Sequence, residues 1–397
     1  MDIEALKAKV CDGVDRRADL LLDASHQIHE HPELAFEEHF AHDLLTGILA
    51  DQGLSPERSA FGVATAFAAR TGDGVGPTVA VMCEYDALPG VGHACGHNII
   101  AAAGLGAGLA AAAIAGEAGG RLVILGTPAE EGGGGKVAMA EAGALDGLDA
   151  ALMVHPADAD LLSMDAIAVQ QLMVHYEGRA AHAAAAPWDG RNALDAAVLG
   201  YMGVAALRQH IRSDERLHGI FTKAGDRPNV VPREAAAHWY IRSPTTAGVA
   251  ALMPRVVACL EGGASAAGCT CRIELEAYPY WDMRDNLAML GAYTANAAAL
   301  GRPPADPRDG HRVVGSTDMG NVSYRVPSIH PMIKVAPDGV PIHTEEFATH
   351  ARAAAGDAAV LYGAKAMAMT IVDLWCQPDL ASQAARELAG AVTGDPR

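Results

Sequence analysis

Residues 81–98 contain the densest group of side chains that can bind a metal ion. The segment reads V-M-C-E-Y-D-A-L-P-G-V-G-H-A-C-G-H-N, in which an apolar run ends at Glu84 and Asp86 and a Pro-Gly turn follows. Cys95 and His97 are separated by one residue, so in extended backbone both side chains face the same side. Thiolate, imidazole and carboxylate groups together suit zinc or another late divalent transition metal. The C-x-H spacing is weak evidence by itself, because a buried cysteine beside a hydrogen-bonded histidine has the same sequence.

Two adjacent carboxylates, Glu130 and Glu131, form a second candidate group. They lie in P-A-E-E-G-G-G-G at 128–135, where the run of glycines leaves space near the backbone. Adjacent side chains point in different directions, so one can bind a metal while the other holds a water as general base. A solvated acidic loop is the alternative for this pair. His155, which precedes a proline, and His343, in a loop opened by Asp-Gly and Pro, are further candidates, and each is ambiguous when taken alone.

The elements that must position these groups are three apolar runs typical of buried parallel strands. The runs span 78–84, 121–126 and 150–155, with helical segments at 98–116 and 136–145 between them. This order predicts a β-α-β-α-β unit of an α/β domain, in which the site lies at the carboxyl ends of the strands. Asp86, then Glu130 and Glu131, then His155 follow the three runs. We therefore expect their side chains to meet at one edge of the sheet.

The region 168–284 has a different pattern, which predicts a second, inserted domain. It reads as strand 169–177, helix 191–211, strands 217–224 and 236–241, helix 248–260 and strand 271–277. The β-α-β-β-α-β order is the ferredoxin-like α+β arrangement. The catalytic domain would then comprise 1–167 and 285–397, with a mixed or parallel sheet flanked by helices. Its other predicted elements are helices within 4–30, 36–53, 286–300 and 348–375 and a strand at 328–335.

The composition and net charge indicate which class of protein this is and which partners are disfavoured. Half of the 397 residues are hydrophobic and 19% are charged, as expected of a soluble globular protein. A formal net charge of -19 disfavours nucleic acid or an anionic membrane surface as the main partner. Seven scattered cysteines fit reduced thiols, and the start of the chain has no signal-peptide core, so we expect a cytoplasmic protein. The apolar stretch 99–115 predicts a buried helix rather than a membrane span.

Seven short motifs are spread over nearly the whole chain. They are I-H-E-H-P-E-L-A-F-E-E at 28–38, Y-D-A-L-P at 85–89, H-A-C-G-H-N at 93–98, P-A-E-E-G-G-G-G at 128–135, G-R-A-A-H-A at 178–183, S-T-D-M-G-N-V-S at 316–323 and I-H-T-E-E-F at 342–347. In this order they resemble the aminoacylase/carboxypeptidase family of dinuclear metallopeptidases. The resemblance is to its amidohydrolase branch, which contains N-acyl-amino-acid hydrolases, p-aminobenzoyl-glutamate hydrolase and related dipeptidase-like proteins.

The resemblance implies a metal-dependent hydrolase with two divalent ions per chain, such as zinc, manganese or cobalt. The implied ligands are Cys95, His97, Glu131, His155 and His343. Glu130 would be the general base that takes a proton from a metal-activated water, and Asp86 would orient a ligand imidazole. The implied substrate is a small molecule with an amide bond: an N-acyl or aminoacyl amino acid, a small dipeptide, or a compound like p-aminobenzoyl-glutamate.

The resemblance also assigns roles to the inserted domain, as a lid and dimerisation domain. His182 would donate a hydrogen bond to the developing oxyanion, in the site of the partner subunit of a homodimer. Asn229 would contact substrate. Arg242 could grip a substrate carboxylate, with a surface arginine at a strand end as the alternative. Asn98 replaces the aspartate that many members of the branch carry, which points to the p-aminobenzoyl-glutamate-hydrolase-like and dipeptidase-like members.

Two other functions remain open at the level of sequence. The same water-activating site could deaminate an aromatic amine. The alternative from another functional class is a non-catalytic binding protein on this scaffold. Such a protein would be expected to lack the general base or a metal ligand, and this sequence has both. His29 and His31 lie in a motif that the resemblance places near the site, and their roles stay open. Cys269 and Cys271 read as buried thiols of a strand.

Overall fold

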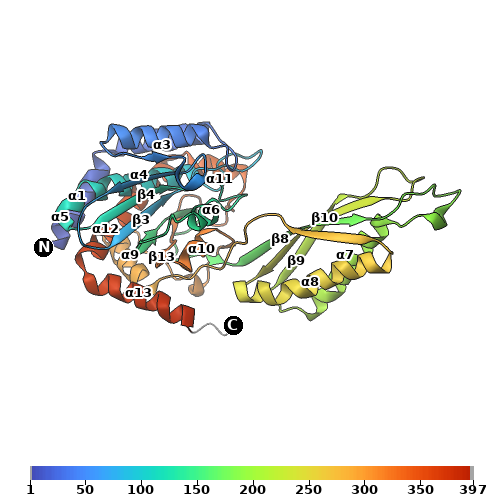
Figure 1. Cartoon of the computed structure of the whole chain (residues 1–397). Coiled ribbons are helices and arrows are strands. Elements are labelled where there is room, and N and C mark those ends of the chain that lie inside the picture. The colour runs from blue at the N-terminus through green and yellow to red at the C-terminus, as the bar shows by residue number, and fades with distance from the viewer. Residues whose placement is uncertain (1, 394–397) are drawn as a thin grey trace. The chain divides into compact units, whose positions relative to one another are not determined.

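The chain forms two compact units in the computed structural model, which describes residues 2–393 (Figure 1). Residues up to Asp165 and from Met283 onward make up the first unit, and Ala166–Asp282 make up the second. Met1 and residues 394–397, which the sequence assigns to the catalytic domain, lie outside the described residues.

A six-stranded mixed sheet is the centre of the first unit. Its order is β1 (Glu57–Arg58), β2 (Phe67–Thr71), β4 (Arg121–Gly126), β3 (Thr78–Cys83), β5 (Ala150–Leu152) and β13 (Ser328–Ile329). The neighbours from β4 to β13 are parallel, which confirms the predicted β-α-β-α-β unit, whereas β1 and β2 are antiparallel additions that the sequence analysis missed.

Alternate residues of β3 face two different cores, because successive side chains of a strand point to opposite faces. Val79, Val81 and Cys83 belong to the larger core, and Ala80 and Met82 belong to the smaller one. The helices of the larger core include α1 (Ile3–Asp15), α2 (Ala18–Glu30), α3 (His39–Asp51), α4 (His97–Ala112), α9 (Leu287–Ala299) and α12 (Ala354–Cys376). The helices α6 (Gly135–Glu141) and α10 (Met319–Ser323) cover the other face. The predicted sheet flanked by helices is therefore confirmed.

Several predicted elements differ in their bounds. The helical pattern at 4–30 is two helices, and the pattern at 348–375 is α11 (Glu345–Ala351) followed by α12; α13 (Pro378–Thr393) was not predicted. The run 150–155 ends as β5 at Leu152, and His155 instead begins β6 (His155–Ala157), which pairs with β14 (Met332–Lys334). Pro331 stands opposite this break, and a proline has no N–H with which to continue the ladder.

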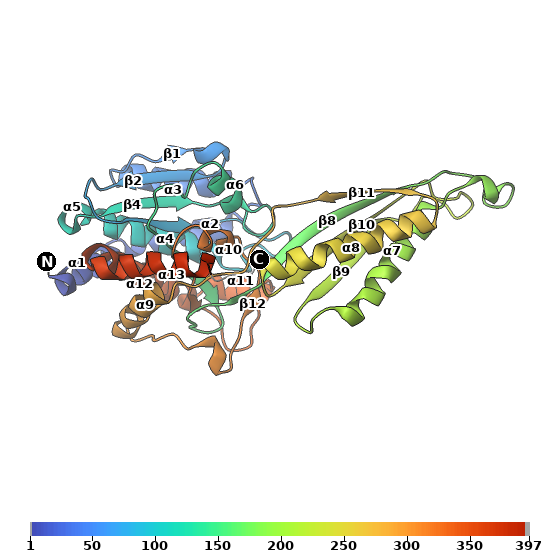
Figure 2. The ribbon, with the colours of Figure 1, turned by 60° about the horizontal axis from the view of Figure 1, so that its bottom comes forward.

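The second unit is a four-stranded antiparallel sheet with two helices (Figure 2). The order is β11 (Thr270–Leu275), β8 (Ala168–Glu177), β10 (Glu234–Ser243) and β9 (Arg216–Lys223), and the helices are α7 (Ala193–Leu207) and α8 (Thr246–Ala266). Counted along the chain this is strand order 4-1-3-2, the ferredoxin-like topology that the sequence predicts. One face of the sheet and both helices share a core that contains Tyr176, Trp239 and Leu260.

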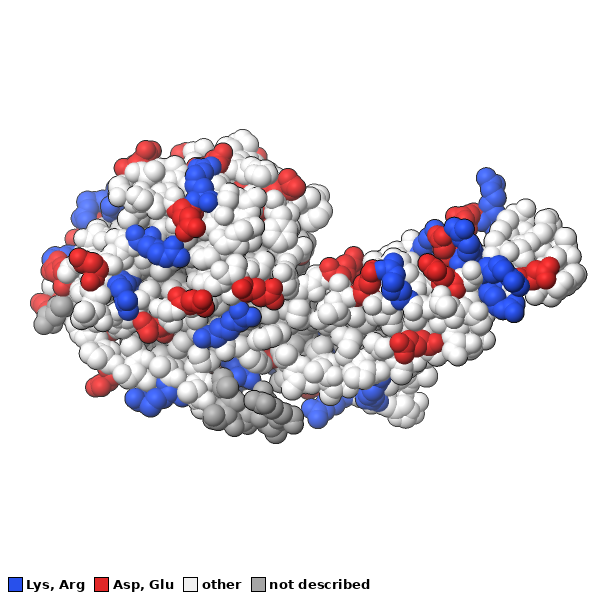
Figure 3. All heavy atoms as spheres, in the orientation of Figure 1, with Lys and Arg blue, Asp and Glu red and all other residues white. Residues whose placement is uncertain are grey.

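The remaining short elements are α5 (Ala115–Ala118), β7 (Asp165–Ala166) and β12 (Val314–Gly315). Two helices of the described chain, α8 and α12, have the length and apolar composition that a membrane span would need, and α12 is mostly buried in its own unit. The predicted buried helix at 99–115 is α4, which is enclosed along almost its whole length. On the face seen in Figure 3, Lys and Arg are interspersed with Asp and Glu over both units.

Gly104 tests how closely α4 packs on β3. A Cβ atom at this position would lie 2.6 Å from the carbonyl oxygen of Met82 and 2.8 Å from Cys83 Sγ. We expect Gly104→Ala to lower the free energy of unfolding by about 1–3 kcal/mol, as overpacking does. Gly47 of α3 is the matched control, because a Cβ atom there would meet no described atom within 4 Å. Gly47→Ala should raise stability by about 0.5–1 kcal/mol. Equal effects of the two changes in urea unfolding would contradict this packing.

Candidate metal centre

The five predicted ligands of the first unit come together as two overlapping sets. Cys95, His97 and His155 form one set, and Cys95, Glu131 and His343 form the other; within each set the ligand atoms lie within 4.8 Å of one another. Cys95 belongs to both sets, so its sulfur can bridge two ions. The sequence analysis had expected Glu131 and His155 to meet at one edge of the sheet and had added Cys95, His97 and His343 through the family resemblance; the structure brings all five residues together.

Glycine at position 96 allows Cys95 and His155 to meet. Gly96 has φ of 79°, a left-handed conformation that suits glycine, and it forms the N-cap of α4, whose first residue is His97. A Cβ atom here would lie 2.8 Å from the ring of Pro156. The close approach leaves Cys95 Sγ 3.4 Å from His155 Nε2.

The loop with the two glutamates is held by Glu38 and Asp86. Ala129 has φ of 59°, and its N–H donates to Glu38 Oε1 at 2.8 Å. Thr65 donates to the other oxygen of Glu38 at 2.7 Å. The N–H of Glu131 donates to Asp86 Oδ2 at 2.8 Å. Glu38 lies in the motif at 28–38, but nothing in that motif showed that its carboxylate fixes the backbone beside Glu130.

Hydrogen bonds assign the ring nitrogens of two histidines. His97 Nδ1 lies 3.0 Å from Asp86 Oδ1 and 2.9 Å from the carbonyl oxygen of Asp86, and both are acceptors, so Nδ1 carries the hydrogen. The Nδ1 of His155 likewise donates to the carbonyl oxygen of Pro156 at 2.8 Å. In each ring the Nε2 lone pair therefore faces the cluster, which is the orientation that metal ligation needs.

Negative charge crowds around His97 Nε2. Oxygens of Glu84, Glu131 and Glu130 lie 3.5, 3.8 and 4.0 Å from this nitrogen, and His97 and Glu84 are fully buried. A lone pair among carboxylate oxygens is unfavourable unless a positive charge lies between them. Among the buried atoms of residues 2–393 that lack a hydrogen-bond partner are His97 Nε2, Glu84 Oε2 and Glu131 Oε1. These residues fit a divalent cation.

The pKa shifts follow from burial in this negative field. Burial raises the pKa of Cys95 well above its usual range, and the charge of Glu131 adds to the effect. Burial also raises the pKa of Glu130, with Glu84 and Glu131 contributing. Burial opposes a charge on His97, but Cys95 and Asp86 outweigh it and raise the pKa of His97. Burial lowers the pKa of His155 to about 3, so its imidazole is neutral. A divalent cation would favour the thiolate and the neutral imidazoles together.

Three of the predicted site residues lie in the second unit. His182 is exposed in the loop after β8, and its Nδ1 accepts from the N–H groups of Ala184 and Ala185, so its Nε2 carries the hydrogen. Asn229 lies beside this loop, since its carbonyl oxygen accepts from the N–H of Ala183 at 3.0 Å.

Arg242 is separated from His182 and Asn229 within the second unit. It lies near the end of β10, opposite Val169 at the start of β8, whereas the His182 loop follows the far end of β8. About eight residues of strand correspond to roughly 26 Å. The Nε of Arg242 donates to His218 Nε2 at 3.3 Å. Arg242, the predicted partner of a substrate carboxylate, therefore does not lie close to His182 or Asn229 within the second unit.

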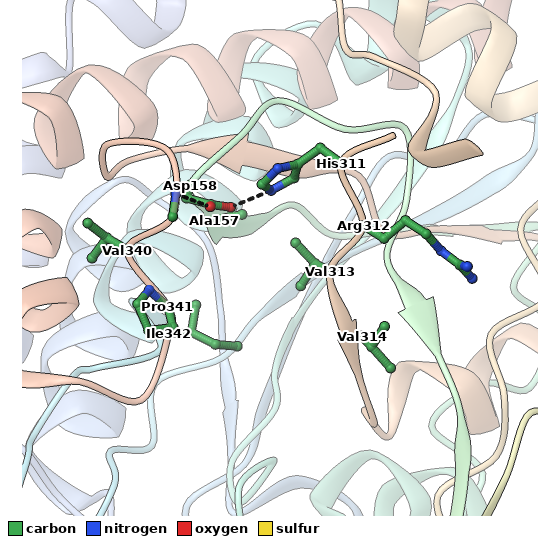
Figure 4. Close-up of a pocket in the computed structure, with 10 residues that line it drawn as sticks. Ala157, Asp158, His311, Arg312, Val313, Val314, Val340, Pro341 and Ile342 are labelled. Carbon is green, nitrogen blue, oxygen red and sulfur yellow. Dashed lines mark hydrogen bonds and ion pairs between the residues drawn. The ribbon is translucent and has the colours of Figure 1, made fainter. Parts of the chain in front are cut away.

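A pocket of about 240 Å³ lies beside the loop of His343 (Figure 4). Asp158 is its buried carboxylate; one oxygen is 2.9 Å from His311 Nε2 and the other accepts from the N–H of Gly339 at 2.8 Å. Val340, Pro341 and Ile342 supply apolar walls. The segment from Gly339 then reaches His343, whose N–H donates to the carbonyl oxygen of Ala94 at 2.8 Å. Asp158 and Ala94 thus hold the two ends of the segment that carries His343, a link that the sequence did not reveal.

The other motif residues have structural partners. Asn98 donates to Ser25 Oγ at 2.9 Å and to the carbonyl oxygen of Ala351 at 3.2 Å, and it belongs to neither ligand set. His29 Nε2 pairs with the carbonyl oxygen of Ala348, and His31 Nδ1 with that of Gln27. His330 was unnoticed in the sequence, yet it is fully buried with its ring centre 5.3 Å from that of His155.

Glu38 makes stability depend on pH. Burial, with a smaller contribution from Asp86, raises its pKa to about 7 in the folded protein, against about 4.3 in an unfolded chain. The unfolded state therefore loses its proton first as the pH rises, and the folded state becomes relatively less stable between about pH 4.3 and 7. The quantity to follow is the difference between the unfolding free energies of the wild type and Glu38→Gln. We expect this difference to fall by about 2–3 kcal/mol as the pH rises over this range.

Denaturant unfolding of both proteins at a series of pH values measures this difference. Glu37→Gln is the matched control, because Glu37 is the exposed neighbour and its substitution should leave the pH profile unchanged. Parallel profiles for wild type and Glu38→Gln would show that Glu38 is ionised throughout.

Comparison with known proteins places the chain in a family. The model of peptidase family M20/M25/M40 matches residues 78–372. The Xaa-Arg dipeptidase of Mus musculus is 40% identical over 396 residues, which cover 96% of this chain and 91% of the relative. A p-aminobenzoyl-glutamate hydrolase polypeptide of Escherichia coli (strain K12) is 29% identical over 450 residues, covering 95% of this chain and 93% of the relative.

Solved structures show the same fold. The aminobenzoyl-glutamate utilization protein of Klebsiella pneumoniae superposes with a TM-score of 0.74 at 20% identity, covering 91% of this chain and 97% of that one. A dinuclear metal binding peptidase of the M20 family from Bacillus subtilis has a TM-score of 0.66 at 20% identity, covering 90% and 99%. The expected family and reaction are therefore confirmed: the chain belongs to peptidase family M20/M25/M40 and is a metal-dependent hydrolase of amide C–N bonds.

Proposed function

We propose that the chain is a dipeptidase whose centre holds two divalent ions. The two ligand sets that share Cys95 carry this proposal, because Cys95 with two further residues in each set would hold two ions. His97 and His155 would hold one ion, and Glu131 and His343 the other. A Cys, His and Glu set suits zinc, manganese or cobalt. When bound, such ions lower the pKa of a shared water and polarise a substrate carbonyl.

The proposed role of Glu130 is to move the proton. It is buried next to the ligand Glu131, and one of its carboxylate oxygens lies 4.0 Å from His97 Nε2. Burial and the neighbouring carboxylates raise its pKa, so it holds a proton more readily than a surface glutamate does. A carboxylate of this kind can take a proton from water and deliver it to the leaving amine. Asp86 keeps His97 in the tautomer that ligation needs.

The proposed role of His182 is to donate a hydrogen bond to the carbonyl oxygen as negative charge develops. Its Nδ1 accepts two backbone hydrogen bonds, which leaves Nε2–H as the donor. We place this action in the partner subunit of a homodimer, with Asn229 beside it as a substrate contact. Exposed apolar side chains of α7, Val198 and Met202, support an interface of the second unit. Arg242 would meet substrate at a different place from these two residues.

The proposed substrate is a dipeptide with a basic C-terminal residue. The likeness to an Xaa-Arg dipeptidase over nearly the whole of both chains supports it, and a protein with a net charge of -19 attracts cations. The buried carboxylate Asp158, in the pocket next to the His343 loop, is a candidate partner for a substrate cation. We also propose that the enzyme works in the cytoplasm, where thiols such as Cys95 stay reduced.

Substitution of the proposed base tests the mechanism. Glu130→Gln should bind as much metal as the wild type, because Glu130 is outside both ligand sets that share Cys95. Its turnover should fall by about 10²–10⁴-fold, the usual contribution of a general base. Metal content by elemental analysis and hydrolysis of alanyl-arginine are the two measurements. Near-normal turnover with full metal content would remove Glu130 from the role of base.

Paired substrates test the preference for a basic residue. Alanyl-arginine and alanyl-citrulline have nearly the same shape, but only arginine is charged. We expect kcat/KM to be about 10–100-fold higher for alanyl-arginine, because a charge-assisted hydrogen bond contributes about 1.5–3 kcal/mol. p-Aminobenzoyl-glutamate and an aromatic amine, assayed with added zinc, manganese or cobalt, complete the panel. Equal values for the two dipeptides, or faster hydrolysis of p-aminobenzoyl-glutamate, would contradict the proposed substrate.

A further inference from the structure

A buried network of charges lies directly behind the metal centre. Lys136, in the first turn of α6, is 2% exposed and contacts two fully buried carboxylates. Its ammonium group pairs with Glu84 Oε1 and lies 2.6 Å from Asp318 Oδ1, and its backbone N–H donates to Asp318 Oδ2 at 2.9 Å. Burial opposes the charge of Lys136, but Asp318 and Glu84 outweigh it and raise its pKa.

The two oxygens of Glu84 have different surroundings. Oε1 is engaged by Lys136, whereas Oε2 has no hydrogen-bond partner among residues 2–393. Oε2 lies 3.5 Å from His97 Nε2, and it belongs to a third group of candidate ligand atoms, with His97 and Glu130. A carboxylate oxygen that is fully buried without a partner is costly, so its position requires an explanation.

A purely structural ion pair does not explain this geometry. Such a pair would leave Glu84 Oε2 and His97 Nε2, which lie 3.5 Å apart, each without a hydrogen-bond partner among residues 2–393. A cation bound by both atoms satisfies them together. Carboxylates that bind metals are commonly held by a second hydrogen bond to the other oxygen, and Lys136 supplies that bond here.

We propose that Glu84 is a further ligand of the ion that His97 holds, and that Lys136 is the residue that positions it. This inference rests on the proposed metal centre. His97 is the residue that the group of Glu84 shares with the set of Cys95 and His155. Lys136 fixes Oε1 and directs Oε2 to the ion, while Asp318 holds Lys136 from the opposite side.

Cobalt(II) provides the test, because its visible absorption reports the number and type of ligands. The wild type, Glu84→Gln and Asp373→Asn would be loaded with cobalt, and the affinity of each site would be measured by competition with a chelator. We expect Glu84→Gln to weaken one of the two sites by at least about tenfold and to change the absorption bands of that ion alone. Asp373→Asn is the matched control, because Asp373 is also a buried carboxylate paired with a lysine, Lys7, at 2.8 Å, and it belongs to no candidate ligand group. It should leave the bands unchanged.

Further variants show whether a negative result comes from misfolding of Glu84→Gln, from a wrong role for Glu84, or from the absence of a metal centre. If Glu84→Gln does not fold, Glu84→Asp keeps the carboxylate on a shorter side chain, and it should change the bands of one ion while those of the other stay the same. Lys136→Met should weaken the same site as Glu84→Gln, and Lys136→Arg should restore part of the affinity. Unchanged cobalt spectra in the Glu84 variants, or the same change in Asp373→Asn, would overturn the role of Glu84. A wild type that binds no cobalt would instead refute the proposed metal centre.

Discussion

The negative charge buried around His97 is the constraint on which the first unit depends. Glu84, Asp86 and Glu130 are each less than a tenth exposed and lie around one imidazole, with Lys136 as a buried positive partner. Burying this much like charge costs free energy unless cations compensate for it. The family is metal-dependent, and the ligand sets lie where the compensation is needed. Folding and metal binding are thus expected to be coupled in this unit.

The backbone around the centre is shaped to bring these charges together. Gly96 takes a left-handed conformation against Pro156, and Ala129 takes one although it is not a glycine. Glu38 stabilises Ala129 by accepting its N–H, and Asp86 does the same for Glu131. Strained backbone of this kind persists only where its surroundings hold it. Asp86 therefore serves two purposes, because it accepts from the proposed ligand His97 and also from the backbone N–H of Glu131.

The second unit contributes a separate set of groups on a self-contained fold. Its loop after β8 orients His182 through two backbone N–H groups, so the available donor is determined by local structure. Asn229 accompanies that loop, while Arg242 belongs to the other end of the sheet. The proposed donor His182 lies in the second unit, and the proposed metal ligands lie in the first. This division of labour is consistent with relatives that differ in the small amides for which they are named.

The sequence by itself determined the family and the order of the central strands and helices of each unit, but not β1, β2 or α13. Apolar runs at 78–84 and 121–126 became parallel strands because residues buried on both faces must be apolar throughout, and the strand-helix order of 168–284 became a ferredoxin-like sheet. The proposed ligands could be named because their motifs are short and local. Only the tertiary structure decided what surrounds them, since Glu38, Lys136 and Asp158 act through partners that are far away in the sequence. Contacts of that kind depend on distances between elements, which no local pattern of residues encodes.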